Sequence, residues 1–334
     1  MKKNTPLLFT LCAALLCSLA GCGGNPPNDV PSDSSGITQN SGPSEQASPV
    51  GDFEYTGNSD NGITISKYTG NDTDVLIPEK IDGKDVTQIG KNIFAHKQNL
   101  VSVKIPDTVT VIEFGAFKDC LALTTVNIPP RLTSIKNAAF SGCSKLTDIT
   151  LPETLTEIAQ MAFEKCSSLT KIKIPKTVTI WGQQVFLSCT GIKEIELEEG
   201  LQTIGYGAFA NTGVANVVLP ASMREVGEGA FGACPNLTSI TLNEGLVTLD
   251  TLSLGGQSKL TEVVIPASVK NINERTFSGC SSLKSVKFEG DAPENYIHSD
   301  PRITAVDVDY TIYYHSGAKG FTTPEWNGYK TQTW

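Results

Sequence analysis

The chain has 334 residues, of which 39% are apolar, 18% charged and 7% aromatic, and it contains 30 Gly and 18 Pro. A chain this apolar is not disordered throughout, and this many glycines and prolines exclude a protein built of long helices. The formal charge of −9 would repel a phosphate backbone, so nucleic acid is not an expected partner.

The N-terminus has the features of an export signal. Lys2 and Lys3 precede a short apolar run, Leu7 to Leu16, which is too short to span a bilayer as a mature helix. The next residues, Leu19-Ala20-Gly21-Cys22, resemble the lipobox of bacterial lipoproteins. The resemblance implies cleavage before Cys22, a lipid on its thiol, and an anchor on the outer face of a bacterial cell membrane. An ordinary signal cut at a nearby small residue is the alternative.

The segment after Cys22 predicts a flexible tether. Residues 23–51 are nearly all Gly, Pro, Ser, Asn, Asp and Gln, and they hold too little apolar surface to offset the entropy of ordering. Such a chain reaches roughly 30 Å, enough to hold a domain away from lipid headgroups. We therefore predict a signal peptide at 1–21 and a tether at 22–51.

The rest of the chain is built on a repeat of 23 residues with one interval of 22. A unit this short cannot bury its apolar face alone, so copies must stack into a solenoid. Two apolar columns mark the repeat at a constant offset of five residues. The later column is Phe94, Phe117, Phe140, Phe163, Phe186, Phe209, Phe231, Leu254 and Phe277, and the earlier one is Ile89, Ile112, Ile135, Ile158, Trp181, Ile204, Val226, Leu249 and Ile272.

Each repeat also carries one strand signal. In Leu100-x-x-Val103-x-Ile105-Pro106 the last apolar positions alternate as in a strand with one buried face, and the proline ends the strand. We predict one strand per repeat, paired in parallel with the next, and a first turn at Val75 to Pro78.

The full pattern L-x-x-[VI]-x-[IL]-P-x-x-[VL]-x-x-I-x-x-x-A-F-x-x-C resembles the BspA-type leucine-rich repeat of bacterial surface proteins. The resemblance implies a leucine-rich-repeat solenoid that is mainly β, with parallel strands, short helical or irregular convex segments, and caps at both ends. The predicted ranges are an N-terminal cap with its first turn at 52–90, the repeats at 91–288, and an aromatic-rich C-terminal cap at 289–334.

Six cysteines form another column of the repeat: Cys120, Cys143, Cys166, Cys189, Cys234 and Cys280. Their spacing follows the architecture, and side chains that run parallel on stacked turns are poorly placed for bridging. A small, half-buried filler is the simplest interpretation. Disulfides and a metal site remain as alternatives.

Nothing in the sequence predicts catalysis. The three histidines, His96, His298 and His315, have no Ser, Cys or carboxylate partner at a meaningful spacing. We expect no enzyme activity, no cofactor and no bound metal.

The side chains that the strands present to solvent are the candidate ligand-binding face, since a solenoid offers its ligands an extended surface. Lys171 and Lys173 lie on the strand next to Glu194 and Glu196, so cross-strand pairing should neutralise much of that patch. A face that is only solvated is the alternative, because binding hot spots usually contain Trp, Tyr or Arg. The candidate residues are Lys104, Asn127, Asp148, Thr150, Lys171, Lys173, Glu194, Glu196, Thr241 and Glu262.

A second candidate platform is aromatic and lies near the C-terminus, at Tyr313, Tyr314, Trp326 and Tyr329. These rings could stack on a sugar or dock a protein. They could equally cover the open apolar end of the last repeat.

Taken together, these features predict a non-catalytic surface module for recognition or adhesion. The resemblance implies binding to a host matrix protein, a host cell-surface protein or a glycan. We expect a monomer attached to the membrane by its lipid. The alternatives are a glycan- or solute-capturing lipoprotein that serves a transporter, and a passive spacer in the envelope.

Overall fold

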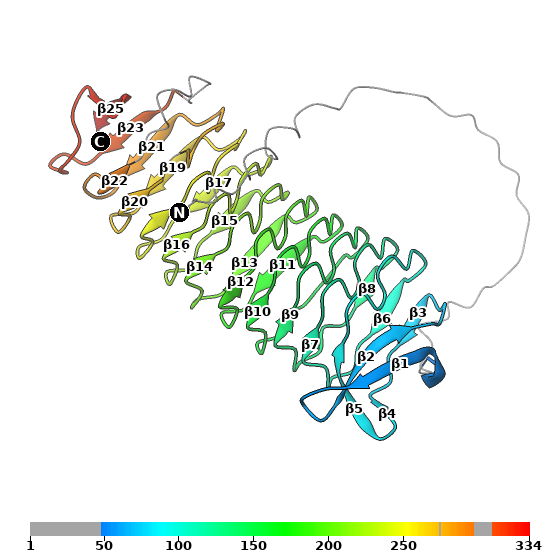
Figure 1. The fold of residues 1–334 in the computed structure, drawn as a ribbon. Coiled ribbons are helices and arrows are strands. Elements are labelled where there is room, and N and C mark those ends of the chain that lie inside the picture. The colour runs from blue at the N-terminus through cyan, green and yellow to red at the C-terminus, as the bar shows by residue number, and fades with distance from the viewer. Residues whose placement is uncertain (1–47, 274, 297–308) are drawn as a thin grey trace, which may run out of the picture. The chain divides into compact units, whose positions relative to one another are not determined.

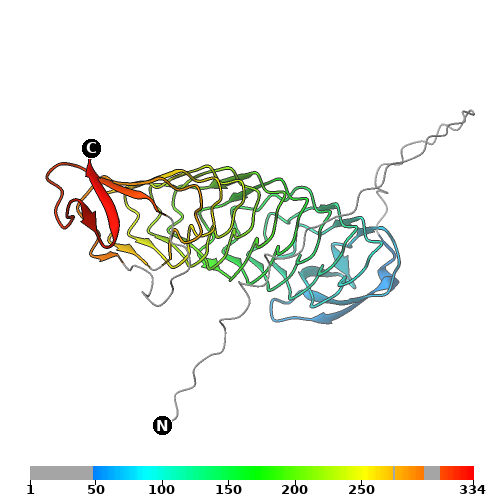
Figure 2. The same ribbon diagram turned by 90° about the horizontal axis from the view of Figure 1, so that it is seen from above.

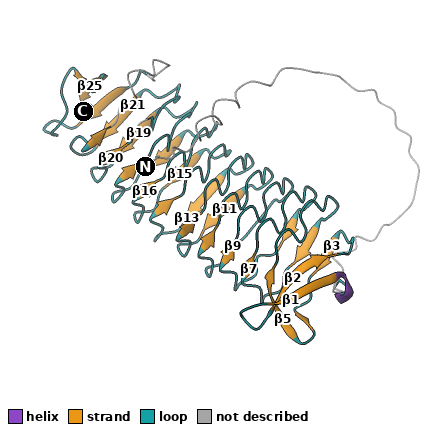
Figure 3. Cartoon of the chain, viewed as in Figure 1, coloured by secondary structure: helices purple, strands orange, loops and turns teal. Residues whose placement is uncertain are grey.

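The computed structural model describes residues 48–273, 275–296 and 309–334, which form a solenoid of stacked turns (Figures 1 and 2). The predicted signal peptide and Cys22 lie outside the described residues. Among the described residues the only helical element is η1 (Val50–Asp52), and turns connect the strands (Figure 3).

The predicted strands form one side of the solenoid, which we call the first ladder. Neighbouring strands pair in parallel, although gaps in this pairing divide the ladder into four short sheets. The segment from Asp148 to Thr150 has the alternating burial of a strand but no ladder hydrogen bonds. The first ladder comprises β3 (Asp74–Leu76), β6 (Ser102–Lys104), β8 (Thr125–Val126), β11 (Lys171–Ile174), β13 (Glu194–Leu197), β15 (Asn216–Val218), β17 (Ser239–Thr241), β19 (Glu262–Ile265), β21 (Ser285–Phe288), β23 (Thr311–Tyr314) and β25 (Tyr329–Thr333).

A second ladder lies on another side of the solenoid, and the prediction of one strand per repeat missed it. Most of its strands are only two residues long, and these short strands end in register with the column that begins with Ile89 and Ile112. Two residues are too few to show a period-2 pattern in a sequence. The second ladder comprises β2 (Ile63–Tyr68), β5 (Lys84–Ile89), β7 (Val111–Ile112), β9 (Ser134–Ile135), β10 (Glu157–Ile158), β12 (Ile180–Trp181), β14 (Thr203–Ile204), β16 (Glu225–Val226), β18 (Thr248–Leu249), β20 (Asn271–Ile272) and β22 (Asn295–Tyr296).

The segment around each Phe-column residue is also bonded from turn to turn. In one repeat the backbone N–H groups of Gly115, Phe117 and Asp119 donate to carbonyls of the next turn at 3.0, 2.7 and 2.7 Å. The residues two positions before and two positions after the Phe column have positive φ, including non-glycine residues such as Met161 (φ 56°) and Ala233 (φ 53°). All three sides of the solenoid are therefore held by backbone hydrogen bonds.

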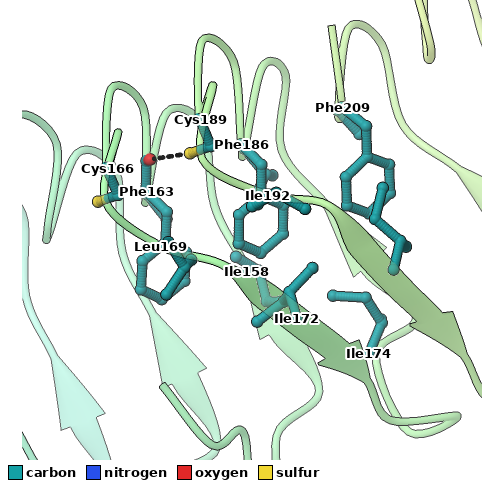
Figure 4. Packing of buried hydrophobic residues seen from close by; sticks show 14 of the residues in the cluster. Ile158, Phe163, Cys166, Leu169, Ile172, Ile174, Phe186, Cys189, Ile192 and Phe209 are labelled. Carbon is teal, nitrogen blue, oxygen red and sulfur yellow. Dashed lines mark hydrogen bonds between the residues drawn. The ribbon is translucent and has the colours of Figure 1, made fainter. Parts of the chain in front are cut away.

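The interior is a continuous apolar core with a stack of phenyl rings along it. Seven Phe-column rings from Phe94 to Phe231 follow one another at centroid distances of 5.0 to 5.5 Å with planes within 11° of parallel. This offset stacking is a favoured geometry for aromatic pairs. Figure 4 shows Phe163, Phe186 and Phe209 in the stack beside the buried residues of both ladders.

Two hairpins cover the N-terminal end. β1 (Phe53–Gly57) pairs antiparallel with β2, and β4 (Lys80–Ile81) pairs antiparallel with β5. The backbone N–H of Ser48 donates to the carbonyl of Leu76 at 3.1 Å, and the hydroxyl of Ser48 accepts from the N–H of Leu76 at 3.2 Å. Ser48, which lies in the range predicted to be tether, is thus part of the folded body.

At the C-terminal end both ladders continue beyond residue 288. β22 extends the second ladder, β23 and β25 extend the first, and β24 (Glu325–Trp326) pairs antiparallel with β25. Aromatic rings then close the core. Trp326 packs between Tyr296 and Phe321 at centroid distances of 4.8 and 4.9 Å.

Candidate binding face

From β3 to β23, the outward side chains of the first ladder form two parallel columns, which we call the ladder face. Strand register defines them: Lys171 stands opposite Glu194, and Lys173 stands opposite Glu196. The first column is Asp74, Ser102, Thr125, Asp148, Lys171, Glu194, Asn216, Ser239, Glu262, Ser285 and Thr311, and Ser285 alone among them is buried. The second is Leu76, Lys104, Asn127, Thr150, Lys173, Glu196, Val218, Thr241, Val264, Lys287 and Tyr313.

Every candidate residue predicted for this face is exposed to solvent. The apolar residues between the two columns, such as Val103 and Ile172, are at most 8% exposed. Period-2 alternation thus places the candidates outward. Two apolar side chains join them, because Val218 is 61% and Val264 is 37% exposed.

Charge pairing on the face differs in part from the prediction. Lys173 lies 3.7 Å from Glu196 Oε1, yet its closer partner is Glu198, with Nζ 2.6 Å from Oε1. Glu198 occupies the position where most repeats have Pro, and the hydrogen bond from Lys173 lowers the pKa of its carboxyl. Lys171 and Glu194 face each other in register, but no ion pair joins these two described residues. Their charges remain available to a partner.

Two other candidates are engaged within the face. The amide of Asn127 accepts from the N–H of Ile105 at 2.6 Å and donates to the carbonyl of Ile105 at 2.8 Å, so it extends the ladder. Glu262 accepts from Lys287 at 2.7 Å and from Ser285 at 2.9 Å, and the bond from Lys287 is the main cause of the lowered pKa of its carboxyl. Both side chains are less free than their exposure suggests.

The aromatic candidates divide between the face and the cap. Tyr313 pairs in register with Lys287, so it belongs to the second column of the ladder face. Tyr314 is buried, with its ring stacked on Phe321 at 4.7 Å. The half-buried rings of Trp326 and Tyr329 lie 4.8 and 6.3 Å from that of Tyr296. Three of these four rings therefore cover the apolar C-terminal end of the solenoid, and the fourth, Tyr313, belongs to the ladder face.

The six body cysteines are fully buried rather than half-buried. Each thiol donates to the backbone carbonyl of the Phe-column residue one turn earlier, as from Cys189 to Phe163 at 3.0 Å (Figure 4). In the same slot, Gln257 donates through Nε2 to the carbonyl of Phe231 at 2.5 Å. Burial raises the pKa of the Cys120 thiol to about 12 and that of Cys280 to about 11. The column supplies small hydrogen-bond donors to the core.

The described residues offer no grouping suited to chemistry. No three of their His, Cys, Asp and Glu side chains gather in a way that could hold a metal ion. His96 Nδ1 lies 3.5 Å from Asp119 and His315 Nε2 lies 2.9 Å from Glu289, in separate parts of the solenoid, while His298 is outside the described residues. The described part of the chain also has no helix with the length and apolarity of a membrane span.

The family model of the BspA-type leucine-rich repeat region matches residues 87–214 and 202–300, in six copies. The chain belongs to the BspA-type leucine-rich repeat family. Leucine-rich repeat proteins are in general non-enzymatic modules that present a recognition surface, and this BspA-type chain has the solenoid that such a surface requires. No curated protein matches its sequence.

Solved structures of bacterial proteins share the fold of this BspA-type chain. A leucine-rich repeat protein of Bacteroides ovatus is 25% identical, with a TM-score of 0.67 over 79% of this chain and 70% of that one. The T. pallidum leucine-rich repeat protein is 25% identical, with a TM-score of 0.50 over 71% and 91% of the two chains. A protein of Faecalibacterium prausnitzii described as a leucine-rich cell surface protein is 24% identical, with a TM-score of 0.50 over 78% and 96%.

Proposed function

We propose that this protein is a lipid-anchored recognition or adhesion module on the outside of a bacterial cell, and that it binds a protein of a host matrix or another cell through its ladder face. The observation that carries the proposal is the pair of outward columns, which runs along the first ladder without chemical machinery. The export signal and the lipobox ending at Cys22 support the location.

The character of the face favours a protein ligand over a glycan. Its columns alternate charged, hydroxyl and β-branched side chains, and Tyr313 is the only aromatic ring among the residues that define them. Sugar sites more often rely on aromatic platforms, whereas a row of charges can be matched by complementary charges on a protein. A ligand would meet Lys171 and Glu194 with their charges not yet paired to each other.

Binding by the immobilised full chain to a panel of matrix proteins and to a glycan array tests the proposal. Replacing Lys171→Glu together with Lys173→Glu should weaken capture at least tenfold. The same change should alter the free energy of unfolding by only about 0 to 1 kcal/mol, because exposed ion pairs contribute little.

The conservative change Trp326→Phe serves as the control for the C-terminal cap. Loss of capture on that change, with the lysine replacements silent, would move the binding site to the cap. Substrate turnover by the purified chain would refute a pure binding role. Capture on the glycan array alone would change the ligand class.

A further inference from the structure

The ladder face has a charge pattern that is complementary to itself. β11 carries Lys171 and Lys173, and the neighbouring β13 carries Glu194 and Glu196, so positive and negative rows lie side by side at the middle of the ladder. Consider a two-fold axis that runs parallel to the strands between β11 and β13, in the plane of the face. This axis places β11 of one copy over β13 of the other, and lysines over glutamates on both sides.

The same axis matches the charges further out. It places the segment 148–150 over β15, so Asp148 meets the uncharged Asn216, and it places β8 over β17, where the outward side chains are uncharged. It also places β6 over β19 and β3 over β21. In those pairs Lys104 comes near Glu262, and Asp74 comes near Lys287.

No like charges on the two columns oppose each other in this arrangement. A shift of the axis by half a strand spacing, onto β11, would place β11 over itself and bring Lys171 and Lys173 against their own copies, which is repulsive. The charge order therefore favours the register centred between β11 and β13, in which Lys171 opposes Glu194 and Lys173 opposes Glu196 on both sides of the axis. Figure 1 shows the strands of the first ladder following one another in a row, as such a register requires.

We propose that the ladder face binds a second copy of this chain in an antiparallel, two-fold symmetric contact centred between β11 and β13. The proposal rests on the proposed use of this face for recognition and names one of its partners. It differs from the monomer expected from the sequence.

The small area of this contact predicts weak self-association. From β3 to β21 the face spans ten strand positions, so at about 4.8 Å per strand and a width of about 10 Å it offers roughly 450 Å² per copy. Stable complexes bury about 800 Å² per partner. Self-association should therefore be weak and sensitive to salt. Its effective strength increases where many copies are anchored on one membrane surface, because their local concentration is higher there.

Charge reversal tests the proposal in the full chain, purified in a mild non-ionic detergent and measured by sedimentation equilibrium. Lys171→Glu with Lys173→Glu should weaken self-association at least tenfold, and so should Glu194→Lys with Glu196→Lys. Mixed together, the two variants should associate as strongly as the wild type, because each row of one variant then faces the opposite charge of the other. Off the face, Lys91→Glu with Lys145→Glu makes the same change in net charge and should have no effect.

The geometry has its own test. Thr150→Cys with Val218→Cys should be cross-linked into a dimer by a short bismaleimide, since the axis places these positions opposite each other across faces about 10 Å apart, whereas Thr133→Cys outside the face should not. A wild type that stays monomeric at low salt would overturn the proposal, as would mixed variants that do not associate or cysteine pairs that do not link. If capture of a matrix protein persists in such a case, the proposed function stands and only self-recognition fails.

Discussion

Removing one ring of the phenyl stack should destabilise the solenoid far more than truncating a residue of the ladder face. Phe140 is fully buried, and its ring lies 5.0 Å from Phe117 and 5.3 Å from Phe163 with nearly parallel planes. A buried Phe→Ala change costs about 3 to 5 kcal/mol, which already includes the loss of stacking contacts worth about 0.5 to 1.5 kcal/mol each. The cost of Phe140→Ala should fall in the upper part of that range, because the change removes the ring contacts with both Phe117 and Phe163.

The matched comparison is Phe277→Ala, in the same column but with less stacking. Its ring makes one edge contact, to Tyr310 at 6.1 Å, and Leu254 replaces the ring on the turn before it. This change should cost about 3 kcal/mol, and Thr125→Ala on the exposed face less than about 0.5 kcal/mol. Urea unfolding followed by circular dichroism measures all three. Equal losses for Phe140 and Thr125 would refute the assignment of inward and outward columns.

Four further outcomes are expected. Ala233→Gly, at φ 53°, should stabilise the chain by up to about 1 kcal/mol in thermal or urea unfolding, whereas Ala221→Gly, at ordinary φ, should destabilise it by about 0.5 to 1 kcal/mol. Iodoacetamide at neutral pH should label none of the six body thiols in the folded chain and all of them after denaturation, as mass spectrometry can show; a protected pair would reveal a disulfide. Burial raises the pKa of the Glu157 carboxyl, but hydrogen bonds from Lys136 and Ser134 outweigh burial and hold this pKa below 4.5. The stability that the ionised carboxylate contributes is therefore present above pH 4.5 and is lost as the pH falls through the lowered pKa. Glu157→Gln should reduce this loss of stability in acid unfolding. Finally, Cys22→Ala should move the protein from the detergent phase to the aqueous phase, and unchanged partitioning would argue against a lipid anchor.

The first ladder could be predicted from the sequence because its strands show as an alternation of apolar and polar residues. Alternation around Val103 and Ile172 places one face in the core, and the constant offset of the Phe column requires that copies stack. The outward candidates follow from the same alternation. Their use as a binding site stays a prediction.

The features that could not be predicted from the sequence depend on backbone geometry. The second ladder has strands of two residues, and the left-handed positions include Met161 and Leu252 beside the expected Gly and Asn, so neither feature leaves a clear residue signal. The acceptor for each buried cysteine is a main-chain carbonyl, which no sequence pattern reveals. Tyr313 follows Lys287 by 26 residues rather than 23, and only strand pairing shows that it continues the ladder face.

Backbone bonds on all three sides have a consequence for how this protein changes over generations. Because each turn is joined to the next by main-chain groups, loss or duplication of one whole unit leaves both ladders in register. The 22-residue interval shows that a single deletion at the corner before Val214 is absorbed as well, where Gly213 runs so close to the Thr190 carbonyl that a Cβ would lie 2.3 Å from it. Recombination between repeats can thus lengthen or shorten the rod in single genetic steps. Substitution in the outward columns can meanwhile alter what the surface recognises without rebuilding the fold.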